Sequence, residues 1–126
     1  MKEIMAIIRM NMINRTKKAL TEAGVSSITA SDALGRGAGL IDMKLLKGAE
    51  QGYEEAISQL GQSNRLIPKR MIVIVSKDKY VEKIVKTIIT VNRTGKSGDG
   101  KIFVMPCHDS LSVRTGEHGE ETLDDI

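Results

Sequence analysis

The sequence predicts one α+β domain in which an antiparallel sheet carries two helices on one face. Short runs of Ile, Val and Met have the composition of strands, and two other stretches place apolar residues every three or four positions. The order strand-helix-strand occurs twice, separated by a long insert at residues 35–68. This order is that of the split β-α-β, or ferredoxin-like, fold.

The first half begins with a short strand rich in Ile and Met, which we expect at residues 3–9. Residues 14–23 form the first helix, which Gly24 ends. Its apolar face consists of Ile13, Thr16, Ala19, Leu20 and Ala23. Residues 25–34 alternate loosely between polar and apolar side chains, and we expect a second strand there.

The second half repeats this plan. Residues 70–76, RMIVIVS, are β-branched and continuously apolar, which predicts a buried central strand. Ser76 is expected to cap the next helix, with Asp78 in its first turn. The apolar face of that helix consists of Val81, Ile84, Val85, Ile88 and Val91. Residues 101–105 form another strand, and residues 111–115 are a candidate last strand.

The face of the sheet without helices should also be apolar. In either register, residues 5–8 (MAII) and 71–74 (MIVI) direct aliphatic side chains to it. An exposed apolar sheet face predicts an oligomer.

Composition limits the class of protein. Hydrophobic residues make up 40% of the 126, but aromatic residues only 2%, so the core must be aliphatic. A single cysteine, Cys107, excludes an internal disulfide, and no apolar run is long enough to span a membrane. We therefore expect a cytoplasmic protein, and Cys107 with His108 is too small a set for a zinc site.

Charge is unevenly distributed. Residues 117–126 form an acidic tail with five acids and no Lys or Arg, which leaves a balance of +8 over residues 1–116. The basic part suits an anionic ligand. Nucleic acid is a weaker interpretation, because the three aromatic residues are scattered and form no stacking platform.

A glycine-rich loop, RTGKSGDGKIFV at residues 93–104, carries the strongest chemical signal. It matches the phosphate-loop pattern G-x-x-x-x-G-K, but Ile102 stands where that pattern needs Ser or Thr for magnesium. The loop also lies between a helix and a strand, the reverse of the hydrolase order, so both features argue against nucleotide hydrolysis.

Two interpretations of this loop remain: a helix-ending turn, or a nest of backbone N–H groups that holds phosphate between Lys96 and Lys101. Asp99 argues against direct anion contact and is a candidate brace for the loop. Farther on, Arg114 has a side chain suited to phosphate, although a single arginine is more often only solvated.

With the loop followed by VRTGE at residues 113–117, the chain resembles the PII (GlnB-type) nitrogen-regulatory family. KEIMAIIR, ALTEAGVSSIT and LIPKRMIVIVS match the family's first strand, first helix and third strand. The resemblance covers the chain outside the insert. It implies a trimer of ferredoxin-like subunits with the sheets turned inward.

The resemblance also implies ATP or ADP bound between subunits. The phosphates would lie on the glycine loop, with Arg114 coming from the adjoining subunit, and Ile7 and Thr29 would line the cleft near the adenine. The loop residues are Gly95, Lys96, Gly98, Asp99, Gly100 and Lys101. Gly35 and Arg36 match the start of the mobile T-loop, residues 35–68. A 2-oxoglutarate molecule with magnesium would bind at its base, against Lys69.

Three positions depart from the family pattern. Gly37 stands where a glutamine helps to hold magnesium and 2-oxoglutarate, and Ser112 replaces one arginine of an R-x-R pair. Gln51 occupies the uridylylated tyrosine position, so we expect no modification there, with Tyr53 as the nearest substitute. Lys47, Tyr53 and Glu54 are the candidate target-binding residues of the T-loop.

The long T-loop and its initial GRG resemble the archaeal nitrogenase-associated branch. Its members act in pairs with a PII-like paralogue, as trimers or hexamers, and block the dinitrogenase component until 2-oxoglutarate relieves the block. The alternative hypothesis is a ferredoxin-like module that binds an anionic polymer such as RNA and senses no small molecule. A slow ATPase is a third hypothesis, against which Ile102 argues.

Overall fold

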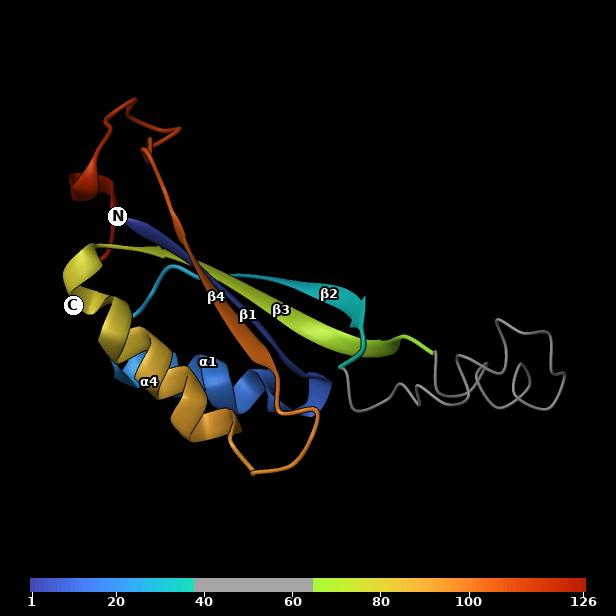
Figure 1. Ribbon diagram of the computed structural model, residues 1–126. Helices are drawn as coiled ribbons and strands as arrows, with labels where there is room; N and C mark the ends of the chain where they lie inside the picture. The colour runs from blue at the N-terminus through green and yellow to red at the C-terminus, as the bar shows by residue number, and fades with distance from the viewer. Residues whose placement is uncertain (38–64) are drawn as a thin grey trace, which may run out of the picture.

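The fold consists of a four-stranded sheet and two helices. The computed structural model describes residues 1–37 and 65–126 (Figure 1). The strands and helices are β1 (Lys2–Arg9), α1 (Ile13–Glu22), β2 (Thr29–Gly35), β3 (Ile67–Ser76), α4 (Val81–Asn92) and β4 (Lys101–Pro106). The sheet order is β2-β3-β1-β4 and every pairing is antiparallel, which confirms the split β-α-β prediction. In the described part of the chain, no helix has the length and apolar character needed to cross a membrane.

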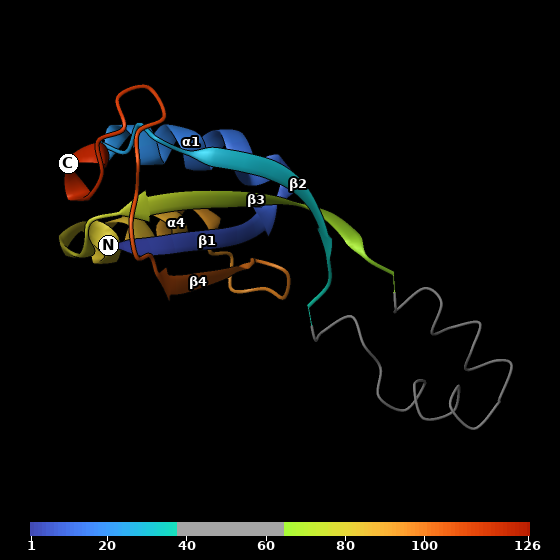
Figure 2. The same ribbon diagram turned by 90° about the horizontal axis from the view of Figure 1, so that it is seen from above.

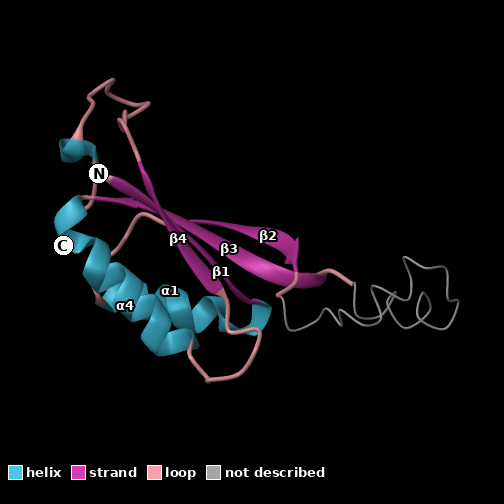
Figure 3. Ribbon diagram, viewed as in Figure 1, coloured by secondary structure: helices cyan, strands magenta, loops and turns pink. Residues whose placement is uncertain are grey.

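Both helices pack on the same side of the sheet, as Figure 3 shows. Alternate residues of the two central strands point toward them and are buried, because side chains along a strand alternate between its faces. The core is entirely aliphatic and consists of Ile4, Ala6, Ile8, Leu20, Val25, Ile72, Ile74, Ile84 and Ile88. The predicted buried central strand at residues 70–76 is therefore confirmed as most of β3.

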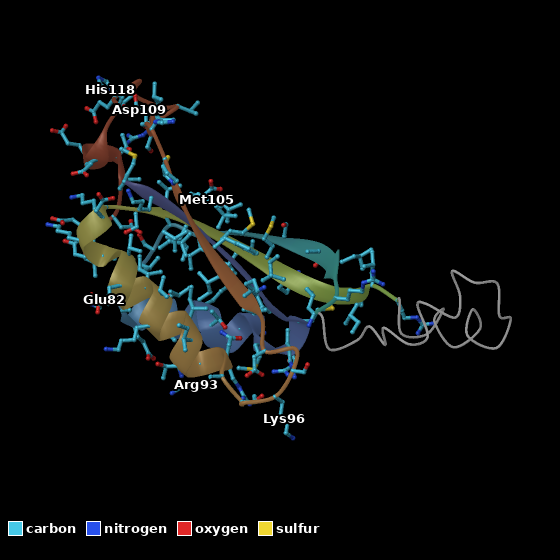
Figure 4. The ribbon with its side chains drawn as sticks, in the orientation of Figure 1. Glu82, Arg93, Lys96, Met105, Asp109 and His118 are labelled. Atoms are coloured by element: carbon cyan, nitrogen blue, oxygen red, sulfur yellow. The ribbon has the colours of Figure 1, made fainter. Side chains whose placement is uncertain are left out.

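The other face of the sheet carries no described element. The register places Met5 beside Val73 and Phe103, and Ile7 beside Met71. Phe103 is 44% exposed, and Figure 4 shows Met105 on the side of β4 away from the helices. The expected apolar open face is present in this chain.

Two predicted details near the ends of strands are wrong. Ser76 does not cap a helix, because its hydroxyl donates to the carbonyl of Lys77 at 2.9 Å. A 3-10 helix, Asp78–Tyr80, precedes α4, and Asp78 lies in its first turn as predicted, where it also pairs with the amino group of Met1 at 3.1 Å. The second strand begins at Thr29, not at residue 25, because Val25 turns into the core directly after Gly24.

The candidate strand at residues 111–115 is not a strand. Leu111 forms only an isolated bridge with His118, and residues 113–115 make the turn between them. The N–H of Gly116 bonds the carbonyl of Ser112 at 2.7 Å, which closes the turn too tightly for an extended segment.

The acidic tail folds back onto the domain. Asp124 accepts hydrogen bonds from the N–H groups of Ser26 and Ser27, both at 2.9 Å. Asp125 accepts one from the Tyr80 hydroxyl at 2.7 Å, and Ile126 packs against the core. Figure 2 shows both termini at one end of the sheet, opposite the ends of β2 and β3 that border residues 38–64.

Asp124→Asn should lower the free energy of unfolding by about 1 kcal/mol at neutral pH, because the carboxylate is the better acceptor. Burial opposes ionisation, but the bonds from Ser26 and Ser27 outweigh it and hold the pKa of Asp124 below its usual 3.8. The stabilisation is therefore present above pH 3.8 and is lost as pH falls below that value. Urea unfolding at several pH values measures it. Glu121→Gln, at an exposed position, is the control, and a difference that does not shrink in acid would contradict the assignment.

Candidate functional site

The glycine loop connects α4 to β4 at the end of the sheet where β1 finishes (Figure 1). Gly95, Gly98 and Gly100 have φ values of +83°, +93° and +121°, which side chains rarely adopt. Gly100 is also in close contact with β1, since a Cβ there would lie 2.2 Å from the carbonyl oxygen of Ile7. The loop therefore needs glycine both for its conformation and for its approach to the sheet.

Asp99 braces this loop from within. Its carboxylate accepts hydrogen bonds from the N–H groups of Thr94 at 2.8 Å and Gly95 at 3.0 Å. It also pairs with Arg9 at 2.7 Å. The Thr94 hydroxyl and N–H are the main causes that hold the pKa of Asp99 far below 3.8, with Arg9 and Gly95 adding to them against the effect of burial. The interpretation of Asp99 as a brace is confirmed.

Part of the loop backbone has N–H groups that are available to a ligand. The N–H of Lys96 bonds the Thr94 hydroxyl at 3.2 Å. Those of Ser97, Gly98 and Gly100 donate no hydrogen bond to any residue that the structure describes. Exposed, unpaired N–H groups on consecutive turns form a concavity that attracts anions.

A pocket of about 440 Å³ opens beside the loop on the open face of the sheet. This volume is within the usual range for small-molecule sites. The lining residues are Ile7, Gly35, Arg36, Gly37, Lys69, Lys96, Gly98, Asp99, Gly100, Lys101 and Phe103. Four are cationic, and the charge of the one acid, Asp99, is balanced by Arg9. The pocket therefore favours an anionic ligand.

The fold thus gathers most of the predicted ligand-binding residues from distant parts of the sequence. Phe103 is the lining residue that the sequence prediction missed. The signal was present, because Phe103 follows Lys101 by two positions on the same face of β4. Lys69 already contacts the loop, since its Nζ donates to the carbonyl of Gly98 at 3.4 Å.

Some predicted residues lie elsewhere. Thr29 is on the open face but pairs with Val73, farther along the sheet. Gly95 does not line the pocket. Lys96 does line it, from the outer end of the loop, and Figure 4 shows its side chain directed away from the sheet. Arg114 is exposed in the turn between Leu111 and His118, which follows the C-terminal end of β4, whereas the pocket lies at the N-terminal end of that strand. Lys47, Tyr53 and Glu54 lie outside the described residues.

A second hollow, of about 410 Å³, lies between α4 and β4. Its walls are mostly aliphatic, from residues such as Val85, Ile89 and Val104. It lacks the concentration of cations found in the pocket on the open face. We therefore place the candidate site at the basic pocket.

Gly100→Ala should disrupt the loop more than Gly95→Ala. Both changes force a side chain into a positive φ, at a cost of about 1–2 kcal/mol. Only Gly100→Ala also drives a Cβ against the Ile7 carbonyl, whereas a Cβ at Gly95 would meet nothing within 4 Å. Denaturant unfolding of the two variants measures the difference. Equal losses would show that the close approach to β1 costs nothing.

Comparison with known proteins agrees with this geometry. The family model "Nitrogen regulatory protein P-II" matches residues 1–117. The "Nitrogen fixation nifHD region GlnB-like protein 2" of Methanobacterium ivanovii is 46% identical over 98% of this chain and 99% of its own length. The "Nitrogen regulatory protein P-II" of Azospirillum brasilense is 35% identical over 98% of this chain and 100% of its own.

The fold has a solved counterpart as well. The crystal structure of Arabidopsis thaliana PII bound to citrate superposes with a TM-score of 0.70 at 32% identity, covering 95% of this chain and 86% of that one. The similarity to nifHD-region proteins confirms the predicted archaeal branch. On these grounds, the chain belongs to the nitrogen regulatory protein P-II family.

Proposed function

We propose that this protein is a non-catalytic transducer of nitrogen status that binds ATP or ADP in the basic pocket. The observation that supports the proposal best is the loop above that pocket, with unpaired N–H groups beside Lys101 and Arg36. Backbone N–H groups together with cations suit the phosphate oxygens of a nucleotide. The apolar side chains of Ile7 and Phe103 suit the nucleoside.

The site is suited to holding the nucleotide intact. Position 102, where a hydrolase loop carries a hydroxyl for magnesium, is isoleucine, and its side chain packs against the core. Among the described residues, the pocket offers one carboxylate, that of Asp99, and the loop and Arg9 already occupy it. No general base is therefore positioned in the described part of the pocket to activate water.

The proposed active form is a trimer of this chain, or a trimer or hexamer with a PII-like paralogue. The pocket opens on the apolar face, so association through that face would close it. An adjoining subunit would then supply Arg114 to the phosphates and place Thr29 near the adenine. These are the roles that the family resemblance assigns to these residues.

The proposed second effector is 2-oxoglutarate with magnesium, held near Lys69 and Gly37. Both residues line the pocket, and the Lys69 ammonium suits a carboxylate. Because Asp99 is occupied, magnesium would depend on phosphate and 2-oxoglutarate oxygens, which suits an ion that keeps few protein ligands. Lys69 would exchange its bond to Gly98 for one to the effector.

The proposed target is a nitrogen-fixation protein, the dinitrogenase component, contacted in the cytoplasm through residues 35–68. The nifHD-region names of the relatives support this choice. The alternative, an RNA-binding module, rests on the basic charge alone. It predicts salt-dependent RNA binding that is indifferent to ATP.

Lys101→Ala should weaken ATP binding about tenfold to a hundredfold, the effect of losing one hydrogen bond between charged groups. Isothermal titration calorimetry measures the affinity, and unfolding should be nearly unchanged because Lys101 is exposed. Lys83→Ala, an exposed lysine on α4, is the matched control. Absence of ATP binding by the wild type at millimolar concentration would refute the proposed function.

Deletion of residues 48–62 should abolish capture of dinitrogenase while ATP binding persists, because the pocket residues lie outside the deleted segment. Pull-down with purified dinitrogenase, with ADP and with ATP plus 2-oxoglutarate, measures the effect. Retention of dinitrogenase by the deleted protein would place target recognition elsewhere.

A further inference from the structure

Arg9 lies outside the glycine loop and binds it through its guanidinium. It ends β1, beside Lys69 of β3, and is separated from the loop by about ninety residues of sequence. One terminal nitrogen, Nη1, donates to the Asp99 carboxylate at 2.7 Å. The other, Nη2, donates to the carbonyl of Ser97 at 3.0 Å. The two side chains of this ion pair are largely covered, with 28% of Arg9 and 23% of Asp99 exposed.

We propose that Arg9 is a positioning residue for phosphate binding: through Ser97 and Asp99 it fixes the glycine loop in the conformation that presents its free N–H groups to the nucleotide. This inference rests on the proposed function. Arg9 would not itself touch the phosphates, because both of its terminal nitrogens already bond the loop. It therefore acts through its partners.

The first effect of Arg9 is geometric. Asp99 holds the start of the loop through the N–H groups of Thr94 and Gly95, and Arg9 ties that carboxylate to the sheet. A guanidinium has rigid, planar donors, so it fixes two acceptors in one orientation. The unpaired N–H groups of Ser97 and Gly98 lie within the segment that Arg9 holds at both ends.

The second effect is electrostatic. The bonds from Thr94 and Gly95 keep Asp99 ionised, so a carboxylate lies in the wall of a pocket proposed to bind phosphate. Arg9 neutralises that charge at a distance of 2.7 Å. Without Arg9, Asp99 would repel the ligand, and the repulsion would increase with the number of phosphate charges.

The test measures ATP, ADP and adenosine affinity for Arg9→Gln by calorimetry. We expect a loss of about tenfold or more for ATP, a smaller loss for ADP and little change for adenosine. Arg9→Lys should recover part of the ATP affinity by restoring the charge without the planar fork. Arg15→Gln, an exposed arginine on α1, is the matched control and should bind as the wild type does.

Two further readouts separate positioning from general stability. Amide exchange at Thr94 and Gly95 should accelerate in Arg9→Gln, while exchange in the core strands should not change. Adding Asp99→Asn to Arg9→Gln should cost less than the sum of the single changes, because both act through one pair.

The outcomes distinguish this inference from the proposed function. If the wild type binds ATP and Arg9→Gln binds it equally well, Arg9 has no positioning role while the function stands. Equal losses for ATP and adenosine would also overturn the inference, since they indicate general damage. If the wild type binds no ATP, both the function and the inference fail.

Discussion

The first strand, β1, is the element on which both the core and the candidate site depend. It pairs with β3 on one side and β4 on the other, so it lies inside the sheet. Its even-numbered residues, Ile4, Ala6 and Ile8, are buried against the helices. Ile7 and Arg9 face the other way and meet the glycine loop, one by its carbonyl and one by its guanidinium. The alternation along one strand thus links packing to ligand binding.

The net charge around the pocket depends on which residues the acids of the loop and of the C-terminal tail pair with. Asp99 is held by the loop and Arg9, and Asp124 and Asp125 are held by Ser26, Ser27, Tyr80 and Lys77. These tail contacts lie at the opposite end of the sheet from the ends of β2 and β3 that border residues 38–64 (Figure 2), and the pocket is lined by Gly35 and Lys69 from those two strands. Arg36, Lys69 and Lys101 therefore surround the pocket with no tail carboxylate from the same chain nearby.

Much of the fold was predictable because strand alternation and helix periodicity act over short distances. The sheet, the helix faces in α1 and α4, and the glycines of the loop follow directly from such patterns. The wrong predictions concern segments whose conformation depends on contacts with other parts of the chain. Ser76 does not cap α4 because its hydroxyl bonds the Lys77 carbonyl and a 3-10 helix, Asp78–Tyr80, lies between Ser76 and α4. The strand β2 begins late because Val25 is buried in the core.

The sequence by itself determined the fold class, the family and most residues of the basic pocket, because each carries a local pattern or a motif. Only the tertiary structure decided that Asp99 turns inward to Arg9, that Phe103 completes the pocket and that Arg114 lies in a turn beyond the far end of β4. Those facts depend on which strands become neighbours. Strand pairing brings together residues about ninety positions apart, and no local pattern encodes that contact.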